Sequence, residues 1–174
     1  MAALNNRKYL PLILTLTIVL LDQAAKALIV LSIPEGRIGA AFFGDFFRII
    51  HVRNLGVVFS LGHTLPDSFR AVLFKIIPLI GLGFLFIFLF KSRDLTPLQR
   101  WSLSGILGGG IGNLADRIFR PGGVVDFLDF KFYGLFGLNR WPTFNLADAS
   151  LVVFGILFVL SMLFGPKAAD EKSI

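Results

Sequence analysis

The residues best suited to chemistry lie in two short stretches of an otherwise apolar chain. GNLADRIFRPGGVVDFLDF, residues 112–130, holds one Asn, three Asp and two Arg around a Pro-Gly-Gly turn, and FNLADAS, residues 144–150, holds a further Asp. Two carboxyl groups that share one site cannot both ionise at low cost, so one of them keeps its proton near neutral pH. Such a pair supplies a base that activates water and an acid that protonates a leaving group.

Composition and spacing remove several other chemistries. The chain contains no Cys, which excludes thiolate nucleophiles, Fe–S clusters and Cys-based zinc sites. Its two His, His51 and His63, lack the HExxH spacing of metalloproteases, and neither a GxSxG nor a Walker loop is present. A Ser–Lys protease would need Lys26 or Lys75 beside one of several scattered Ser, and nothing singles out such a pair. Carboxylate chemistry is what remains.

The overall composition is typical of a membrane protein. Hydrophobic residues make up 55% of the 174 residues and charged residues only 16%, against about a quarter in soluble domains, and the mean hydropathy is +0.78. Because the chain is so apolar, we attribute its net charge of +6 to basic tails beside an anionic membrane surface and expect no nucleic acid partner.

Four apolar runs approach the length of about 20 residues that a spanning helix needs. They lie at approximately 9–31, 71–90, 98–118 and 146–164. The first run could instead be a cleaved signal peptide, but it is longer than the usual apolar region and holds Asp22 and Lys26, so we predict a retained helix. The expected organisation is a single integral membrane domain over residues 1–174, with large loops at about 32–70 and 119–145.

Four consecutive spans place both large loops on one face of the membrane. Residues 46–62 of the first loop alternate partially and predict a short strand pair or a small curved sheet at the membrane surface. Charged groups near the hydrocarbon cost about 2.5–3.5 kcal/mol each on insertion scales and are therefore functional candidates. The polar residues expected on this face are Asp22, Lys26, Asn54, Asn113, Asp116, Arg117, Asp126 and Asp148.

Purely structural roles explain several of these residues equally well. Asp22 and Lys26 are spaced i,i+4 and can simply pair along one helix. Asn113, Asp116 and Arg117 share one helical face and can join the third helix to its neighbours.

The remaining candidates also have structural explanations. Asn145 followed by Asp148 resembles a helix N-cap with an acid at N3, and Asp126 and Asp129 can be ordinary loop acids. The small-xxx-small spacing within GILGGGIG, residues 105–112, is explained by close helix packing.

Two other functional classes also use charged membrane residues. A small transporter or channel could use the polar face as a substrate or ion pathway, although its polar residues usually cross the span or lie at the midplane. A phosphatidyl-transferring enzyme could hold a divalent ion with several Asp, although this chain has no compact run of acids along one helix.

Four motifs, in order along nearly the whole chain, resemble those of bacterial lipoprotein signal peptidase (signal peptidase II, aspartyl peptidase family A8). LDQAAK is similar to the D-Q-x-x-K stretch of this family, and NLGVVFSLG is similar to its N-x-G-x-x-F-S stretch. GGIGNLADRIFRPGGVVDFLDF resembles the G-N-x-x-D-R…G-x-V-x-D-F block, and FNLADAS resembles the F-N-x-A-D block. A mild departure is Val57-Val58, where the family usually has Ala-Ala; the larger pair would narrow the space beside the site.

The resemblance implies an intramembrane aspartyl endopeptidase. Such an enzyme removes signal peptides from diacylglyceryl-modified prolipoproteins, cleaving just before the lipidated Cys, and needs no metal or other cofactor. The implied catalytic pair is Asp126 and Asp148. The residues implied to support the pair or contact substrate are Asp22, Lys26, Asn54, Gly56, Asn113, Asp116, Arg117, Asn145 and Ala147.

The resemblance also implies the fold and the orientation of the protein. The family fold is a membrane all-α domain of four transmembrane helices with a small extracytoplasmic β-cradle and an extracytoplasmic loop or helix. We therefore expect a monomer in the bacterial cytoplasmic (inner) membrane, in contact with membrane lipids, with cytoplasmic termini and a site that faces the periplasm or outside. Because Asp148 begins a helix, whose positive dipole end favours a carboxylate, we expect the shared proton mainly on Asp126.

Overall fold

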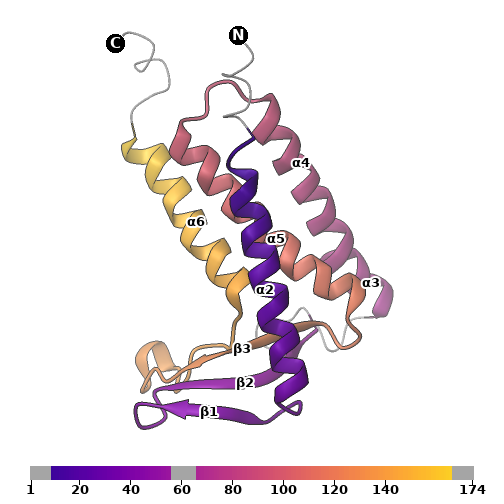
Figure 1. The fold of residues 1–174 in the computed structure, drawn as a ribbon, viewed down its shortest axis with the longest axis vertical. Helices are drawn as coiled ribbons and strands as arrows, with labels where there is room; N and C mark the ends of the chain where they lie inside the picture. The colour runs from indigo at the N-terminus through magenta and orange to yellow at the C-terminus, as the bar shows by residue number, and fades with distance from the viewer. Residues whose placement is uncertain (1–8, 56–65, 166–174) are drawn as a thin grey trace.

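The computed structural model describes residues 9–55 and 66–165, and it shows long helices standing on a small sheet (Figure 1). The first turn of α2 and the last turn of α6 lie at the end of the bundle away from the sheet. The elements in chain order are α2 (Leu12–Ser32), β1 (Ile38–Phe42), β2 (Phe47–Asn54), α3 (Asp67–Ala71), η2 (Val72–Ile76), α4 (Ile77–Lys91), α5 (Pro97–Phe119), β3 (Val124–Phe130), η3 (Leu135–Gly137) and α6 (Leu146–Phe164).

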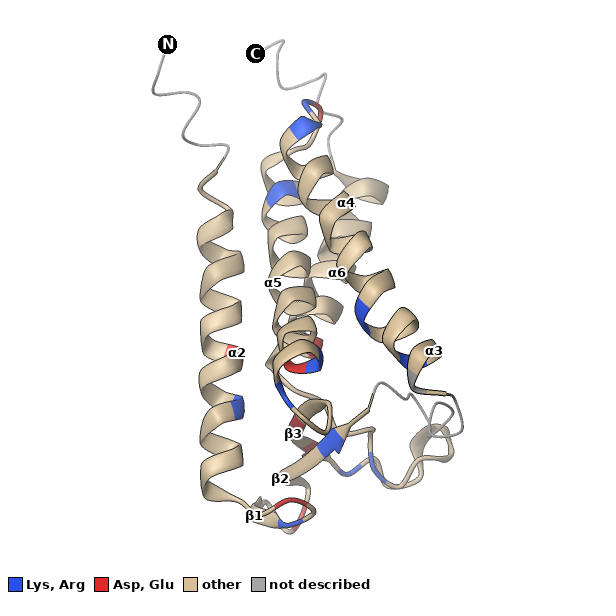
Figure 2. Cartoon of the chain, turned by 90° about the vertical axis from the view of Figure 1, so that its right-hand side faces the viewer, with Lys and Arg blue, Asp and Glu red and all other residues tan. Residues whose placement is uncertain are grey.

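Three helices in the described part of the chain are long and apolar enough to cross a membrane. They are Leu12–Ser32, the continuous segment Ser68–Lys91 formed by α3, η2 and α4, and Leu146–Phe164. Most residues of these helices are uncharged, and most charged residues of the chain lie near helix ends or at the sheet (Figure 2). Asp22 and Lys26 of α2 are the buried exceptions. Because the outward side chains of the three helices are apolar and exposed, lipid rather than water is the medium that suits these helices.

The 23-residue helix α5 forms the centre of the bundle, where the sequence predicts a further span at 98–118. It does not belong to the three apolar helices above, because Gly, Ser and polar residues replace much of its aliphatic surface. It packs against α6, α2 and α4, and many of its side chains are buried. Much of this helix is therefore covered by protein, whereas the other long helices present many apolar side chains outward.

Small residues on α5 allow this close packing, as the small-xxx-small spacing indicates. A Cβ atom on Gly105 would overlap the ring of Phe154 in α6, and one on Gly109 would overlap the carbonyl oxygen of Ala147. On the side toward α2, a Cβ atom on Gly108 would lie 2.9 Å from Cβ of Ile18. Close backbone approach then supplies the dispersion contacts that hold helices together in lipid.

A three-stranded antiparallel sheet closes one end of the bundle, in the order β1-β2-β3. The predicted small sheet is present and residues 46–62 supply β2, but its partners come from elsewhere: β1 precedes that segment and β3 comes from the second large loop. The second large loop, expected at about 119–145, thus contains the strand Val124–Phe130. Gly56, Val57 and Val58 lie outside the described residues.

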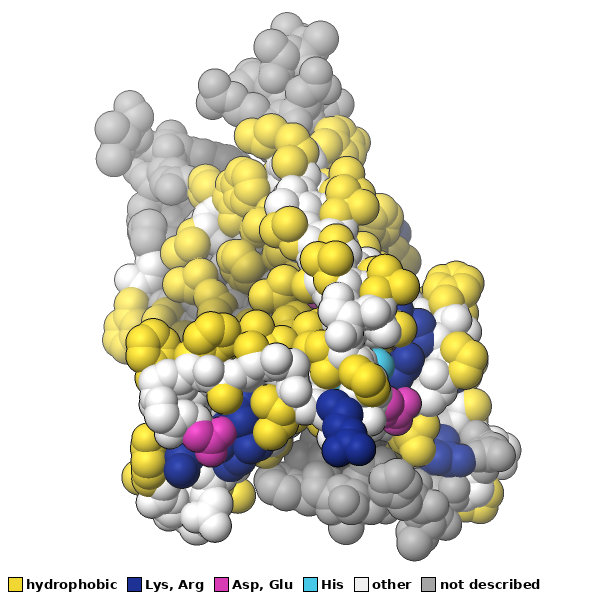
Figure 3. All heavy atoms as spheres, turned by 60° about the horizontal axis from the view of Figure 1, so that its bottom comes forward, with side chains coloured by type: hydrophobic (Ala, Val, Ile, Leu, Met, Phe, Trp, Pro, Cys, Tyr) yellow, Lys and Arg dark blue, Asp and Glu magenta, His cyan; other side chains and the backbone are white. Residues whose placement is uncertain are grey.

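The sheet end of the molecule carries an ionic cluster. Asp129 in β3 is buried, and it accepts hydrogen bonds from Arg48 at 2.6 Å and from Arg140 at 2.8 Å. In a view of this end, basic and acidic side chains lie close to one another below the yellow hydrophobic surface of the helices (Figure 3). Asp129 thus joins β2, β3 and the following loop, and its role is structural.

Candidate active site

Asp126 is presented by β3 and held from two sides. It lies opposite Val52 in the register of β2 and β3, and it is 2% exposed between buried Val125 and Phe127. Its Oδ1 accepts a hydrogen bond from Nδ2 of Asn145 at 2.7 Å, and its Oδ2 accepts one from Nδ2 of Asn54 at 3.0 Å. The strand therefore fixes the backbone of Asp126, while two amides from other elements fix its carboxyl group.

Asp148 lies in the first turn of α6, which begins with a capping box. The backbone N–H of Asp148 donates to Oδ1 of Asn145 at 2.9 Å, and the backbone N–H of Asn145 donates to Oδ2 of Asp148 at 3.2 Å. The predicted N-cap is thus confirmed. Nδ2 of Asn145 also donates a hydrogen bond to Asp126, so the Asn145 side chain contacts both the start of α6 and the carboxyl group of the other acid.

Asn113, late in α5, connects the two carboxyl groups to the rest of the bundle. Its Nδ2 donates to Oδ1 of Asp148 at 2.7 Å, and its Oδ1 accepts from Nδ2 of Asn145 at 3.1 Å and from Nζ of Lys26 at 3.1 Å. Because Lys26 carries only donors, it sets which end of the Asn113 amide faces it. The donor end of Asn113 then faces Asp148.

A buried ionic network underlies the two Asn residues. Nζ of Lys26 lies 2.8 Å from Oδ2 of Asp22 and 3.1 Å from Oδ2 of Asp116, and all three side chains are fully buried. Oδ1 of Asp22 accepts from the backbone N–H of Ala147 at 3.0 Å, and Oδ2 of Asp116 accepts from that of Val125 at 3.0 Å. The predicted Asp22–Lys26 pair is confirmed, and the network holds the backbone next to each dyad residue.

Sequence reasoning missed two residues that complete this network. Nε of Arg120 lies 2.9 Å from Oδ1 of Asp116, and Gln23 donates to the same oxygen at 3.0 Å. The i,i+4 spacing of Asp116 and Arg120 was an available signal for that pair. For Gln23 the only signal in the sequence was its position between Asp22 and Lys26, and this position does not predict which residues it contacts.

The two candidate acids differ in their environment. Burial, and after it the negative charge of Asp148, raises the pKa of Asp126 to about 7, although the hydrogen bonds from Asn54 and Asn145 oppose the rise. Asp148 is only partly buried and lies in the first turn of α6, at the positive end of the helix dipole. At neutral pH this arrangement can hold one protonated and one ionised carboxyl group, which is the requirement for paired acid and base chemistry.

The other candidate residues fall into three groups. Asp22, Lys26, Asn54, Asn113, Asp116, Asn145 and Ala147 all belong to the connected network around Asp126 and Asp148. Arg117 instead lines a neighbouring pocket, and Gly56 lies outside the described residues. Within the described residues, no group of three or more His, Cys, Asp or Glu is arranged to hold a metal ion.

Comparison with known proteins places this arrangement in a family. The model of the family described as "Signal peptidase (SPase) II" matches residues 14–164. The lipoprotein signal peptidase of Treponema pallidum (strain Nichols) is 45% identical over 169 residues, which cover 97% of this chain and 91% of that protein. The lipoprotein signal peptidase of Borrelia duttonii (strain Ly) is 50% identical over 160 residues, covering 92% and 93% of the two chains.

Solved structures agree with the sequence match. Two solved structures described as bacterial membrane enzyme structures by the in meso method, at 2.3 Å and 1.9 Å resolution, have TM-scores of 0.73 and 0.74 with this chain. Their sequence identities are 29% and 28%; the first covers 88% of this chain and 87% of its own, the second 90% and 94%. The chain is a multi-pass bacterial membrane protein. With the family model matching most of its length and close relatives matching nearly all of it, the chain belongs to the signal peptidase II family.

Proposed function

We propose that this protein removes signal peptides from prolipoproteins whose Cys carries a diacylglyceryl group, and that it cleaves just before that Cys. The observation that carries the proposal is the side chain of Asn145, which contacts both Asp126 and Asp148 and so ties two acids far apart in sequence into one site. Membership in the signal peptidase II family supports the same activity.

The difference in environment assigns a role to each acid. The ionised carboxylate of Asp148 takes a proton from a water molecule, and the water oxygen attacks the carbonyl carbon of the scissile peptide bond. The protonated carboxyl group of Asp126 donates to the carbonyl oxygen as the tetrahedral intermediate forms. When the C–N bond breaks, Asp148 gives the proton it took from water to the leaving amine nitrogen. A hydroxyl proton of the intermediate returns to Asp126 as the product carboxyl group forms, so that the dyad ends with one proton, as it began.

The remaining residues of the site act through these two acids. Asn54 and Asn145 orient the carboxyl group of Asp126, and Asn113 orients that of Asp148. The buried network of Asp22, Lys26 and Asp116 supports the Asn113 amide and the backbone at Ala147 and Val125. None of these residues needs to change covalently during the reaction.

The proposal includes an orientation in the membrane. We place α5 as a fourth span, because it runs through the bundle beside the three apolar helices. The sheet and both large loops then lie on the extracytoplasmic face, and both termini are cytoplasmic. In this arrangement the dyad lies near the outer membrane boundary, where a lipid-anchored peptide and water can both reach it. The whole chain acts as a single membrane domain and as a monomer.

The decisive experiment uses two forms of one precursor. The purified full chain is incubated with a diacylglyceryl-modified prolipoprotein and with the same precursor lacking the lipid, and the products are weighed by mass spectrometry. We expect cleavage only of the lipidated form, with the new N-terminus at the modified Cys. Equal cleavage of both forms, or a cut elsewhere in the precursor, would overturn the proposed substrate.

A further inference from the structure

One end of the small sheet carries a cluster of exposed aromatic side chains. Phe43, in the turn between β1 and β2, is 84% exposed, and Tyr133 and Phe136, in the loop after β3, are 69% and 81% exposed. Leu135 of the same loop is exposed as well. We call these four residues the aromatic tip. None of them belongs to a helix that is long and apolar enough to cross a membrane, so a span does not explain their exposure.

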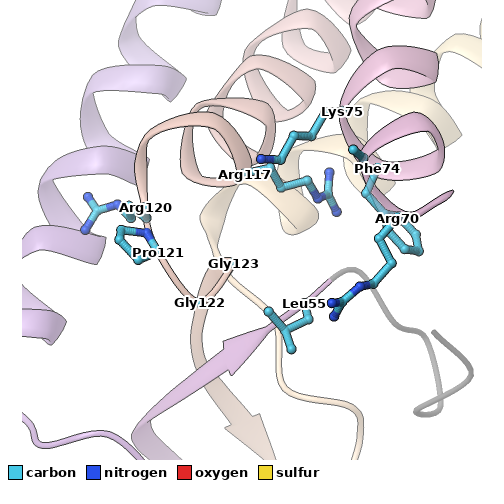
Figure 4. Close-up of a pocket in the computed structure, with 10 residues that line it drawn as sticks. Leu55, Arg70, Phe74, Lys75, Arg117, Arg120, Pro121, Gly122 and Gly123 are labelled. Atoms are coloured by element: carbon cyan, nitrogen blue, oxygen red, sulfur yellow. The ribbon is translucent and has the colours of Figure 1, made fainter. Parts of the chain in front are cut away.

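The aromatic tip is distant from the candidate active site. The eight-residue strand β2, about 25 Å long, begins beside the tip at Phe47 and ends at Asn54, which contacts Asp126. Leu55, the next residue, lines the pocket drawn in Figure 4, and no residue of the tip is among the described lining residues of that pocket. The tip therefore needs an explanation of its own.

The two turns that carry the tip form one preformed unit. The backbone N–H of Lys131 donates to the carbonyl oxygen of Phe46 at 2.8 Å, which joins the turn between β1 and β2 to the loop after β3. The ring of Tyr133 stacks on that of Phe46 with centroids 6.5 Å apart, and the ring of Phe46 packs edge-on to that of Phe130 at 5.8 Å. These contacts within the chain give the tip a fixed shape before any partner binds.

The backbone of the tip is strained at its aromatic residues. Phe43, Tyr133 and Phe136 have φ angles of 53°, 51° and 54°, in the left-handed region that bulky side chains rarely adopt. Gly or Asn would fit such turn positions at lower cost. Backbone strain of this kind is typical of functional positions. Because the side chains at these positions are large, apolar and exposed, they indicate a contact with something outside the chain.

The position of the tip identifies what it contacts. In Figure 1 the orange turn η3, which holds Leu135 and Phe136, lies outward from the helix bundle, at the level where α6 begins and α2 ends. Because these helices cross the membrane, their ends mark the boundary between membrane and water. Aromatic side chains are enriched at this boundary. The medium beside the tip at this level is lipid.

The charged side chains around the tip are paired within the chain. Oδ2 of Asp45 lies 3.8 Å from Nζ of Lys131 and 3.3 Å from Nη1 of Arg140, and Asp129 pairs with both Arg48 and Arg140. Acids and bases therefore alternate in this set, and it presents no patch of a single sign to a charged macromolecule. Paired charges beside exposed aromatic rings fit a lipid surface better than a charged protein partner.

We propose that the aromatic tip inserts into the membrane leaflet at the sheet end of the bundle, at the depth where the acyl chains meet the headgroups. Because β2 and β3 connect the tip to Asn54 and Asp126, this contact holds the sheet at a fixed depth beside the bilayer. The contact needs no particular headgroup and does not depend on the peptidase activity proposed above.

The chain carries its own reporter for this contact. Trp141 is 43% exposed and packs on Phe132 in the loop after β3, whereas the other Trp, Trp101, lies near the start of α5 at the opposite end of the bundle. Trp101→Phe therefore leaves a single fluorophore beside the tip. The full chain with this change is placed in lipid nanodiscs. Its fluorescence is measured with phosphatidylcholine brominated near the headgroup end of the acyl chains, and separately with acrylamide as a quencher in water.

Two variants in this background test the role of the aromatic side chains. Phe43→Asn/Phe136→Asn removes two of them and supplies a residue that tolerates a positive φ, so both turns should stay folded. The matched control, Leu163→Asn/Phe164→Asn, changes two exposed apolar residues at the other end of the bundle.

We expect brominated lipid to remove more than half of the Trp141 fluorescence in the unaltered tip and in the control, and acrylamide to remove little. In Phe43→Asn/Phe136→Asn, quenching by lipid should fall and quenching by acrylamide should rise. Equal quenching by lipid with and without the two Phe side chains would overturn their role in insertion.

The unaltered tip alone decides between lipid, water and protein, whatever the variants do. Strong quenching by acrylamide and none by brominated lipid would overturn the proposal, because the tip would then face water. Protection of Trp141 from both quenchers would also overturn it, because protein, for example a second copy of the chain, would then cover the tip.

Discussion

Asn145 donates a hydrogen bond to Asp126 at 2.7 Å while its own Oδ1 accepts the N–H of Asp148 at 2.9 Å. One amide side chain thus caps the helix that carries one acid and orients the other acid on a strand. The geometry of the site is therefore linked to the start of α6. Because one side chain has both roles, substitutions of Asn145 can distinguish two effects: the stability of the helix and the alignment of the catalytic pair.

Replacing Asn145 with Ser tests this separation. Ser is a good N-cap residue, so Asn145→Ser should keep the start of α6 and change stability by less than the loss of about 1 kcal/mol expected for Asn145→Ala. The shorter side chain has no amide N–H to reach Asp126 or Asn113, so cleavage should fall sharply in both variants. Thermal unfolding in detergent and turnover of a lipidated precursor are the measurements. Full activity in Asn145→Ser would show that the bridge to Asp126 is not needed.

The pH dependence of cleavage follows from the pKa of Asp126, which burial and then the charge of Asp148 raise to about 7. The dyad needs a protonated Asp126, so kcat/KM should be highest below this pKa and should fall as the pH rises through about 7. Because the native pKa lies above the ordinary value of 3.8, ionisation of Asp126 also costs native stability as the pH rises between these values.

Asn54 provides an internal check on this profile. Its hydrogen bond to Asp126 lowers the pKa of that carboxyl group. Asn54→Ala should therefore move the basic limb of the pH–rate profile to higher pH, in addition to any loss of rate. A shift to lower pH would contradict the assignment of this limb to Asp126.

Lys26 should be the residue whose loss most damages the fold. Lys26→Met would leave the buried carboxylate of Asp22 without its cation and Asp116 with Arg120 alone, and breaking such a buried pair costs about 3–5 kcal/mol. The melting temperature in detergent should drop strongly. Lys91→Met, which replaces an exposed lysine at the end of α4, is the matched control and should change stability little. Equal melting temperatures of the two variants would contradict the proposal that this network stabilises the fold.

Two glycines offer a similarly matched test of helix packing. A Cβ atom on Gly109 of α5 would overlap the carbonyl oxygen of Ala147, next to Asp148, whereas a Cβ atom on Gly83 of α4 would meet nothing within 4 Å. Gly109→Ala should therefore push α5 and α6 apart, lowering both the melting temperature and the turnover. Gly83→Ala should be neutral or slightly stabilising, because Ala is the better helix former. Indistinguishable behaviour would refute the close packing of α5 on α6.

The helices were predictable from the sequence because their signals are local. The expected range 146–164 coincides with α6, since Asn145 and Asp148 mark its start and Gly165 its end. The range 98–118 lies within one residue of α5 at each end. By contrast, β3 gives no alternation, because VVDFLDF is buried at nearly every position and both of its faces are covered. Its pairing with β2 joins segments far apart in the chain, which no local pattern encodes.

The site was predictable in its residues but not in its connections. Asp22, Lys26, Asn113 and Asp116 were expected on one face of the membrane, and they do meet. The sequence could not show that Asn145 joins the two acids, because this contact depends on where β3 passes the start of α6. Nor could the sequence separate Asn113 from Arg117, which share a helical face. Asn113 contacts the ionic network, whereas Arg117 lines the neighbouring pocket.

The most direct test of the paired acids is the turnover of a diacylglyceryl-modified precursor by Asp126→Asn and Asp148→Asn, each purified from membranes as the full chain. The control is Asp45→Asn, which changes a 44% exposed acid of the turn between β1 and β2, at a positive-φ position that Asn tolerates. We predict that each dyad variant loses about 10²–10⁴-fold or more of the activity, while all three remain folded and Asp45→Asn stays fully active. Near-normal cleavage by either Asp126→Asn or Asp148→Asn would contradict the account.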